Sequence, residues 1–231
     1  MMTAQWRAAA LVAALLAGGS VAHADRIAMP AAIGGDYSVP VTSLKEGHYK
    51  STIRQQYDFS CGSAALATLL TYQYGYRVSE QAVFEEMFAR GDQAKIKREG
   101  FSLLDIKLYL AAHGFQADGY EAPLDKLAAT GLPAIALIKE NGYNHFVVVK
   151  GLREGRVLIG DPSAGTRSIP RASFESMWTN GILFVVHNKI ETARFNLEDD
   201  WRVAPRAPIG NGVDRNGLGG ITLPKHGAGD F

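Results

Sequence analysis

Hydrophobic residues in the first half of the chain are arranged as expected for helices. The predicted helices cover residues 61–74, 79–90, 102–113 and 123–130. The first of these is rich in Ala and Leu and is hydrophobic on all sides, which indicates a buried helix. Ser79 is a suitable N-cap for the second helix, and Gly91 follows its end. Ser102 and Asp105 have the spacing of a capping box at the start of the third.

The pattern changes after residue 130. Short hydrophobic runs rich in β-branched residues predict strands at 134–139, 146–150, 157–160 and 182–187. Asn141-Gly142 predicts a hairpin between the first two strands, and Glu154-Gly155 predicts a second turn. Residues 170–178 are compatible with a short helix between the last two strands. The expected class is therefore α+β, with a helical half packed against an antiparallel sheet.

Residues 1–24 have the pattern of a secretory signal peptide. Arg7 lies in a short polar start, residues 8–21 are uncharged, and Ala22 and Ala24 place small residues where a signal peptidase cuts. The alternative is a membrane anchor, but a run of 14 residues is shorter than the roughly 20 that span a bilayer. We therefore expect a periplasmic protein whose mature chain has no integral membrane segment.

The remaining chain divides into three parts by composition. Residues 25–50 are expected to form an N-terminal arm, and residues 51–190 a compact domain. Residues 191–231 are rich in Gly and Pro and form a tail that either wraps around the domain or stays disordered. Few large hydrophobic residues other than Trp201 lie in this tail. A truncation after Asn196 is therefore expected to leave the domain folded.

Composition and charge exclude several classes of protein. A content of 47% hydrophobic and 20% charged residues excludes a disordered chain or a coiled coil. With 24 basic and 23 acidic residues, nothing indicates a nucleic-acid partner or a polybasic membrane-binding surface. The single cysteine, Cys61, excludes internal disulfides and any multi-cysteine metal site. Neither a metal nor a cofactor is implied.

Cys61 is the first candidate for chemistry, because it opens a hydrophobic helix directly after a polar loop. A helix N-terminus favours the thiolate over the thiol, which predicts a lowered pKa. Gly62 would let a substrate backbone approach closely. Gln55, six residues earlier, could present its amide beside the thiol and form an oxyanion hole with the Cys61 backbone N–H. The alternative is a small buried cysteine that packs like alanine.

His145 and Asp161 are the candidates that would complete the site. His145 opens the strand at 146–150, just after the predicted hairpin. Antiparallel pairing of that strand with 157–160 would bring Asp161 beside the imidazole, where it could orient the ring as the third member of a triad. The alternatives are an ordinary histidine at a strand end and an aspartate that forms a turn.

These motifs together resemble the bacteriocin-processing cysteine peptidases, which are papain-like domains that cut leader peptides after a double glycine. The resemblance covers roughly residues 54–189. It implies Cys61 as nucleophile, His145 as base, Asp161 as orienting residue and Gln55 as oxyanion donor. The chain lacks the transporter domains usual in the family. It is most similar to the exported, free-standing branch, and there to the periplasmic peptidase of the Fap functional-amyloid system.

Three functions remain open at the level of sequence. The first is a periplasmic cysteine endopeptidase that cuts a secreted protein or peptide, after small residues such as Gly-Gly. Candidate substrates are amyloid subunits or components of an outer-membrane exporter. The second is a non-catalytic binding module for Gly-rich secreted chains, favoured by Ser60, where the family usually has Asp. The third is a transferase on the same fold, in which an amine replaces water.

Overall fold

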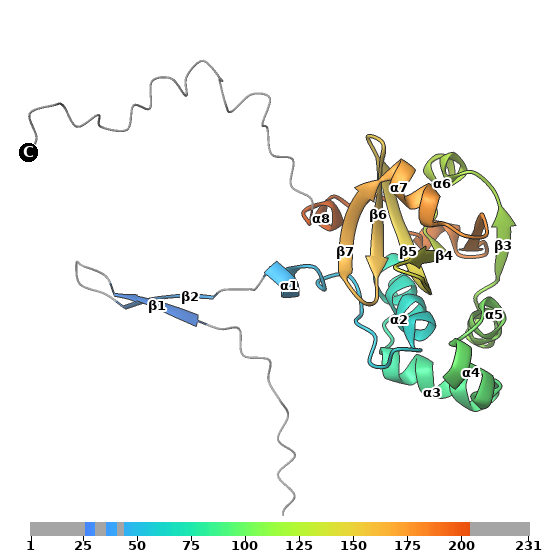
Figure 1. Cartoon of the computed structure of the whole chain (residues 1–231). Helices are drawn as coiled ribbons and strands as arrows, with labels where there is room; N and C mark the ends of the chain where they lie inside the picture. Colours follow the sequence, from blue (N-terminus) through green and yellow to red (C-terminus); the bar gives the residue numbers. More distant parts are fainter. Residues whose placement is uncertain (1–25, 31–35, 41–43, 204–231) are drawn as a thin grey trace, which may run out of the picture. The chain divides into compact units, whose positions relative to one another are not determined.

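The computed structural model describes residues 26–30, 36–40 and 44–203 (Figure 1). The expected signal peptide, residues 1–24, lies outside the described residues. The chain divides into two units, Met1–Ser43 and Leu44–Phe231. In the first, strands β1 (Arg26–Pro30) and β2 (Asp36–Pro40) pair in antiparallel fashion within the expected arm. The second unit holds the candidate site.

The second unit is built on a six-stranded sheet with the strand order β3-β8-β4-β5-β6-β7, in which each neighbouring pair is antiparallel. The strands are β3 (Ala117–Glu121), β4 (Ala134–Glu140), β5 (Tyr143–Arg153), β6 (Arg156–Asp161), β7 (Gly165–Pro170) and β8 (Ile182–Val186). The helices are α1 (Leu44–Gly47), α2 (Cys61–Thr68), η1 (Leu69–Gln73), α3 (Glu80–Arg90), α4 (Gln93–Glu99), α5 (Leu103–Ala112), α6 (Leu124–Thr130), α7 (Arg171–Met177), η2 (Ile190–Thr192) and α8 (Glu198–Trp201). The prediction of a helical half and an antiparallel sheet is confirmed.

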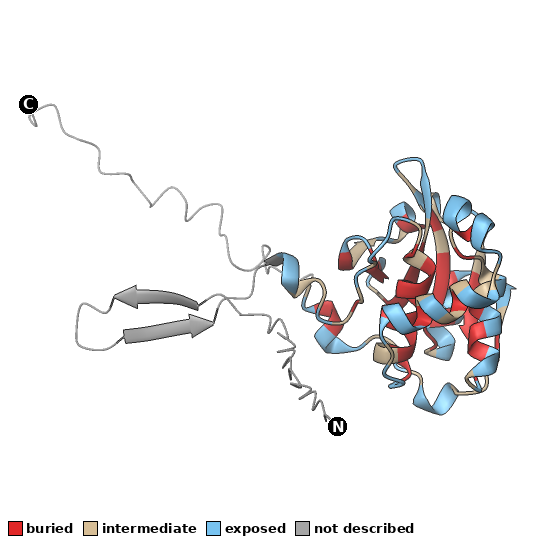
Figure 2. Cartoon of the chain, turned by 90° about the horizontal axis from the view of Figure 1, so that it is seen from below, coloured by how far each residue is buried: buried red, intermediate tan, exposed pale blue. Residues whose placement is uncertain are grey.

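Two clusters of buried hydrophobic side chains pack on the two faces of the sheet. Buried residues are concentrated in the strands and in the helix faces turned towards them (Figure 2). Successive side chains of a strand point to opposite faces, and β5 shows this alternation. Phe146 and Val148 join the cluster that contains residues of α2, α3 and α5. Val147 and Val149 join the second cluster, with Phe174 of α7. Helices therefore cover both faces, and β5 is buried between them.

Helix α2 is buried as its hydrophobic pattern predicted, and it continues into η1, one turn of π-helix. Gly62 has a different role from the expected one. A Cβ atom at this position would lie 2.9 Å from Cβ of Phe101. Glycine therefore lets α2 pack closely against the segment before α5, and the expectation that Gly62 makes room for a substrate backbone is not supported.

The capping residues act as predicted. The Ser79 hydroxyl accepts a hydrogen bond from the Ala82 backbone N–H, and Ser102 and Asp105 form a capping box. Asn141 and Gly142 both have positive φ at the hairpin between β4 and β5, as its turn type requires. The sequence analysis missed α4, β3 and β7, which lack a strong hydrophobic pattern.

The start of the expected tail packs on the domain as far as the structure describes it. Trp201 of α8 is buried, and the Asn196 side chain accepts a hydrogen bond from Leu152 N–H at 2.8 Å. Of the two alternatives for the tail, residues 191–203 therefore show the first, in which the tail wraps around the domain. This packing argues against the expectation that the domain stays folded after a truncation at Asn196. None of the helices in the described ranges has the length and hydrophobicity to cross a membrane.

Candidate active site

Cys61 is the first residue of α2 and is partly buried. The preceding turn is closed by Ser60, whose hydroxyl donates to the Tyr57 carbonyl at 3.0 Å and accepts from the Tyr57 N–H at 3.1 Å. Burial raises the pKa of the Cys61 thiol, and backbone hydrogen bonds from Phe146 and Gly62 only partly oppose this effect. The predicted position at a helix start is confirmed, but the predicted lowering of the pKa is wrong.

The sulfur of Cys61 lies against strand β5. Its hydrogen bond with the backbone of Phe146 places it beside the residue that directly follows His145. Position 145 is near the start of β5, where the strand leaves the hairpin. The fold therefore brings the start of α2 and the histidine-bearing end of β5 together from positions more than 80 residues apart.

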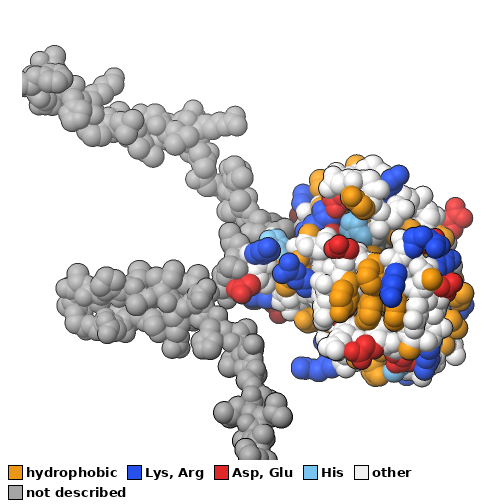
Figure 3. Space-filling model, turned by 60° about the horizontal axis from the view of Figure 1, so that its bottom comes forward, with side chains coloured by type: hydrophobic (Ala, Val, Ile, Leu, Met, Phe, Trp, Pro, Cys, Tyr) orange, Lys and Arg blue, Asp and Glu red, His pale blue; other side chains and the backbone are white. Residues whose placement is uncertain are grey.

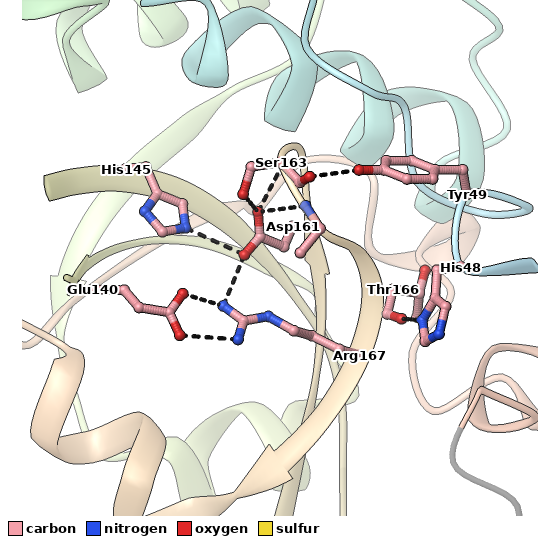
Figure 4. A network of polar contacts seen from close by, with 9 residues as sticks. His48, Tyr49, Glu140, His145, Asp161, Ser163, Thr166 and Arg167 are labelled. Atoms are coloured by element: carbon pink, nitrogen blue, oxygen red, sulfur yellow. Dashed lines mark hydrogen bonds and ion pairs between the residues drawn. The ribbon is translucent and has the colours of Figure 1, made fainter. Parts of the chain in front are cut away.

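His145 and Asp161 are joined as the predicted strand pairing requires. Val148 pairs with Gly160, and Arg153 pairs with Arg156 across the turn. This register returns the end of β6 to the start of β5. Nε2 of His145 lies 3.2 Å from Oδ2 of Asp161, and the carboxylate is fully buried (Figure 4).

The Asp161 carboxylate is held by the turn that follows it. Its Oδ1 accepts hydrogen bonds from the Ser163 backbone N–H at 2.8 Å and from the Ser163 hydroxyl at 2.7 Å (Figure 4). Burial opposes ionisation, but the hydrogen bonds from His145 and Ser163 outweigh it and hold the pKa of this carboxyl well below its usual range. Asp161 is therefore an anion that can orient the imidazole.

Gln55 is linked to both halves of the site. Its backbone N–H donates to the Pro162 carbonyl at 3.1 Å, which connects the loop before Cys61 to the turn after Asp161. Its side-chain amide donates to the Tyr57 carbonyl at 3.0 Å, and its contact with the Asp58 carbonyl is longer, at 3.5 Å. One amide N–H is therefore only weakly engaged within the loop.

Two charged residues that the sequence analysis did not select lie beside Asp161. Arg167 of β7 pairs with Oδ2 of Asp161 at 2.8 Å and with both carboxylate oxygens of Glu140, which ends β4 (Figure 4). Glu140, His145 and Asp161 also bring ligand atoms within 4.8 Å of one another, which is a spacing compatible with a metal ion. Because Arg167 already pairs with both carboxylates, this cluster is an ion-pair network and not a metal site.

The end of the expected arm also reaches this region. The Tyr49 hydroxyl donates to the Ser163 carbonyl at 2.6 Å (Figure 4). The backbone N–H of Thr166 donates to the His48 carbonyl at 2.6 Å. Residues 44–50 are therefore part of the unit that holds Asp161, although composition alone assigned them to the arm.

A cluster of aromatic side chains extends from the loop before Cys61 over α3. Tyr57 and Phe59 stack with a centroid distance of 5.7 Å, and both contact Phe84, which stacks on Phe88. Tyr57 is about half exposed. Seen from the side of α3 and α4, hydrophobic side chains gather in a patch on the surface (Figure 3).

Comparison with known proteins identifies the family of the chain. Residues 49–190 match the peptidase C39 family. A relative from Pseudomonas fluorescens, called a probable functional amyloid protease FapD, is 39% identical over 181 residues, which cover 78% of this chain and 79% of the relative. A protein of the same name from Pseudomonas aeruginosa is 38% identical over 165 residues, which cover 71% of this chain and 73% of the relative.

A solved structure supports the fold. The peptidase domain of Streptococcus ComA, described as a bi-functional ABC transporter involved in a quorum-sensing pathway, aligns with a TM-score of 0.51 at 22% sequence identity. The alignment covers 60% of this chain and 98% of that domain. The expected papain-like fold is thereby confirmed. The chain therefore belongs to the peptidase C39 family, which is a family of cysteine peptidases.

Proposed function

We propose that this chain is a periplasmic cysteine endopeptidase in which Cys61 is the nucleophile, His145 the general base and Asp161 the residue that orients the imidazole. The observation that carries the proposal is the hydrogen bond between His145 and the fully buried Asp161 carboxylate. His145 lies on β5, the strand whose backbone at Phe146 contacts the Cys61 sulfur. A histidine held by an ionised carboxylate near a thiol has the arrangement of a nucleophile, its base and an orienting group.

The reaction begins with transfer of the Cys61 proton to Nδ1 of His145, because Nε2 is occupied by Asp161. The thiolate attacks the scissile carbonyl carbon, and the Cys61 backbone N–H and the Gln55 amide stabilise the resulting oxyanion. His145 then donates its proton to the leaving amine as the C–N bond breaks, which leaves a thioester on Cys61. Water, deprotonated by His145, hydrolyses the thioester and restores the free thiol.

Because the pKa of Cys61 is raised, the thiol needs His145 to accept its proton. Because burial favours the neutral thiol, the helix N-terminus does not activate the sulfur by itself. The proton leaves only if a base is positioned to accept it and the resulting imidazolium is stabilised. The buried, ionised Asp161 supplies that stabilisation. Nucleophile and base therefore act as one coupled pair.

We further propose that the substrate is an exported protein or peptide cut after two small residues, such as Gly-Gly. The family resemblance supports this preference. The pattern of a signal peptide in residues 1–24 supports action in the periplasm. The names of the Pseudomonas relatives support a link to functional amyloid, so amyloid subunits or exporter components are the candidate substrates. The C-terminal tail and the aromatic cluster have no assigned part in the reaction.

A binding module for Gly-rich chains is the second candidate, and Ser60 is the feature that favours it. The Ser60 side chain is fully buried and bonds only to the backbone of Tyr57 among its hydrogen-bond partners in the described chain. It therefore closes the nucleophile turn without supplying a charge. A binder would need neither the Cys61 thiol nor the His145–Asp161 pair.

A peptide library incubated with the purified mature chain separates these functions. The proposed peptidase cuts mainly after Gly-Gly or Gly-Ala, and Cys61→Ala abolishes cutting. Equal cutting after Phe or Leu would contradict the small-residue preference. Binding of Gly-rich peptides without any cleavage would favour the binding module. Products joined to an added amine in place of water would favour the transferase.

A further inference from the structure

Oδ2 of Asp161 has two partners. It accepts a hydrogen bond from Nη2 of Arg167 at 2.8 Å and lies 3.2 Å from Nε2 of His145 (Figure 4). The same guanidinium forms a two-point contact with the Glu140 carboxylate, at 3.0 Å and 2.5 Å. One arginine therefore connects the orienting carboxylate of the proposed triad to a second carboxylate at the end of β4.

Strand register explains why these side chains meet. Asp161 pairs with Gly165, so Arg167, two residues further along β7, stands on the same face diagonal to Asp161. Ile138 pairs with His145, so Glu140, two residues beyond Ile138 on β4, also shares that face. Four neighbouring strands thus each contribute one polar side chain to a single face of the sheet.

The environment of Arg167 makes this contact more than a surface ion pair. The Asp161 side chain is 0% exposed, and those of Arg167 and Glu140 are 24% and 30% exposed. The planar guanidinium holds the Glu140 carboxylate by two parallel N–H···O bonds and still pairs with Asp161, and a lysine ammonium cannot form such a two-point contact. Removing Arg167 would leave two carboxylates facing each other in a partly buried site, next to the imidazole.

We propose that Arg167 is a positioning residue for the peptidase. Its guanidinium fixes the Asp161 carboxylate against His145. Its positive charge also offsets part of the negative charge of Asp161 and Glu140, which limits how strongly Asp161 stabilises the protonated imidazole. This inference rests on the proposed function, because Arg167 acts through Asp161 and His145 and does not touch the thiol. If Asp161 stabilises the protonated imidazole less strongly, His145 releases its proton more readily to the leaving amine.

The ionisable groups in and around the His145–Asp161 pair come from several segments of the fold. They are Cys61 at the start of α2, Glu140 of β4, Asp161 of β6, Arg167 of β7, and Tyr49 with Arg54 from the segment before α2. Glu140 and Arg167 are the two charged side chains of this group that pair with each other, and both can be changed without altering the nucleophile, the base or the orienting residue. Changing these two alters the charge next to Asp161 in opposite directions.

The first experiment follows the titration of the His145 ring by NMR in full-length protein with a Cys61→Ala background. Arg167→Gln makes the local charge more negative and should raise the titration midpoint by about 1 pH unit. Glu140→Gln makes it more positive and should lower the midpoint by a similar amount. The double variant restores the local charge and should return the midpoint to within about 0.3 unit of the parent.

The second experiment separates charge from geometry. Arg167→Lys keeps the charge but loses the two-point contact, so its His145 midpoint should stay near that of the parent. Its kcat should fall by about 10-fold to 100-fold, with KM changed less than about twofold. The matched control is Arg171→Gln, because Arg171 also pairs with two carboxylates, Asp125 and Glu175, but both of these carboxylates are exposed. This control should leave both measurements unchanged.

Several outcomes would overturn the inference. The charge argument is wrong if Arg167→Gln and Glu140→Gln shift the midpoint in the same direction, or if neither shifts it. The positioning argument is wrong if Arg167→Lys keeps the wild-type kcat. The NMR measurement needs no peptidase activity. A chain that cleaves nothing but shows the opposite shifts would therefore contradict the proposed function and leave the role of Arg167 towards Asp161 intact.

Discussion

The ammonium of Lys150 lies 2.9 Å from a carboxylate oxygen of Asp200, and both side chains are buried. The same ammonium donates to the backbone carbonyl and the hydroxyl of Ser51, at 2.8 Å each. This ion pair therefore joins α8, in the segment first expected to be a tail, to β5 and to the segment that precedes Cys61. Burial lowers the pKa of Lys150, and the contact with Asp200 opposes this shift.

Asp200→Asn should destabilise the domain markedly. The substitution leaves the buried ammonium without its counter-charge, which typically costs about 3 kcal/mol or more of unfolding free energy. Urea unfolding at pH 7 measures this change. The neighbouring Asp199→Asn is the matched control, because Asp199 pairs with Arg202 in an exposed position. The control should change the unfolding free energy by less than about 0.5 kcal/mol. Equal effects of the two variants would show that the buried pair does not anchor α8.

His145→Ala should abolish nearly all peptide hydrolysis, to the same extent as Cys61→Ala, because the members of a catalytic unit act together. His187→Ala is the matched control. His187 also pairs with an aspartate, at 3.0 Å from Asp118, but on a different part of the sheet. Steady-state kinetics of the two histidine variants tests the assignment. Loss of activity in His187→Ala with retention in His145→Ala would show that the base has been assigned wrongly.

Alkylation by iodoacetamide should reveal how Cys61 is activated. Burial raises the pKa of this thiol, so without a proton acceptor it stays protonated to a higher pH than an ordinary cysteine. In His145→Ala, the reaction should be slow at pH 7 and should accelerate only above about pH 8.5, where free thiols ionise. The wild-type protein should react faster than His145→Ala at pH 7, because His145 can accept the proton as the sulfur attacks. Identical pH profiles for the two proteins would exclude this coupling.

Gln55→Ala should reduce kcat by roughly 10²–10³ with a smaller effect on KM, because an oxyanion donor acts mainly in the transition state. The adjacent Gln56, which is exposed, provides the control Gln56→Ala. If both variants lose activity equally, the effect belongs to the shape of the loop. A thermal melt of each variant distinguishes such a loss from general destabilisation.

The sequence predicted most of the elements that hold Cys61, His145 and Asp161, because these elements carry strong local signals. Hydrophobic density marks α2, the Asn141-Gly142 turn marks the β4–β5 hairpin, and the pairing of β5 with β6 follows from the next turn. Each signal depends only on residues that are neighbours in the sequence, so it can be recognised without knowledge of the fold.

Arg167, Glu140 and the raised pKa of Cys61 could not be predicted in this way. Strand β7 has a weak hydrophobic pattern. The proposed role of Arg167 depends on its ion pairs with residues of β4 and β6. The burial that raises the pKa of the thiol depends on tertiary packing around the start of α2, where Phe101 and Phe146 lie close to Gly62. These properties arise from tertiary contacts, which local periodicity does not encode.

The central claim is that Cys61 forms a covalent intermediate with its substrate. Rapid-quench intact-mass spectrometry of the mature protein with an activated ester of a peptide ending in Gly-Gly tests this directly. The account predicts that the wild-type protein transiently gains the mass of the acyl peptide and that this adduct maps to Cys61. The adduct should be absent in Cys61→Ala, and any adduct formed in His145→Ala should be long-lived. Hydrolysis without any adduct, or hydrolysis that persists in Cys61→Ala, would contradict it.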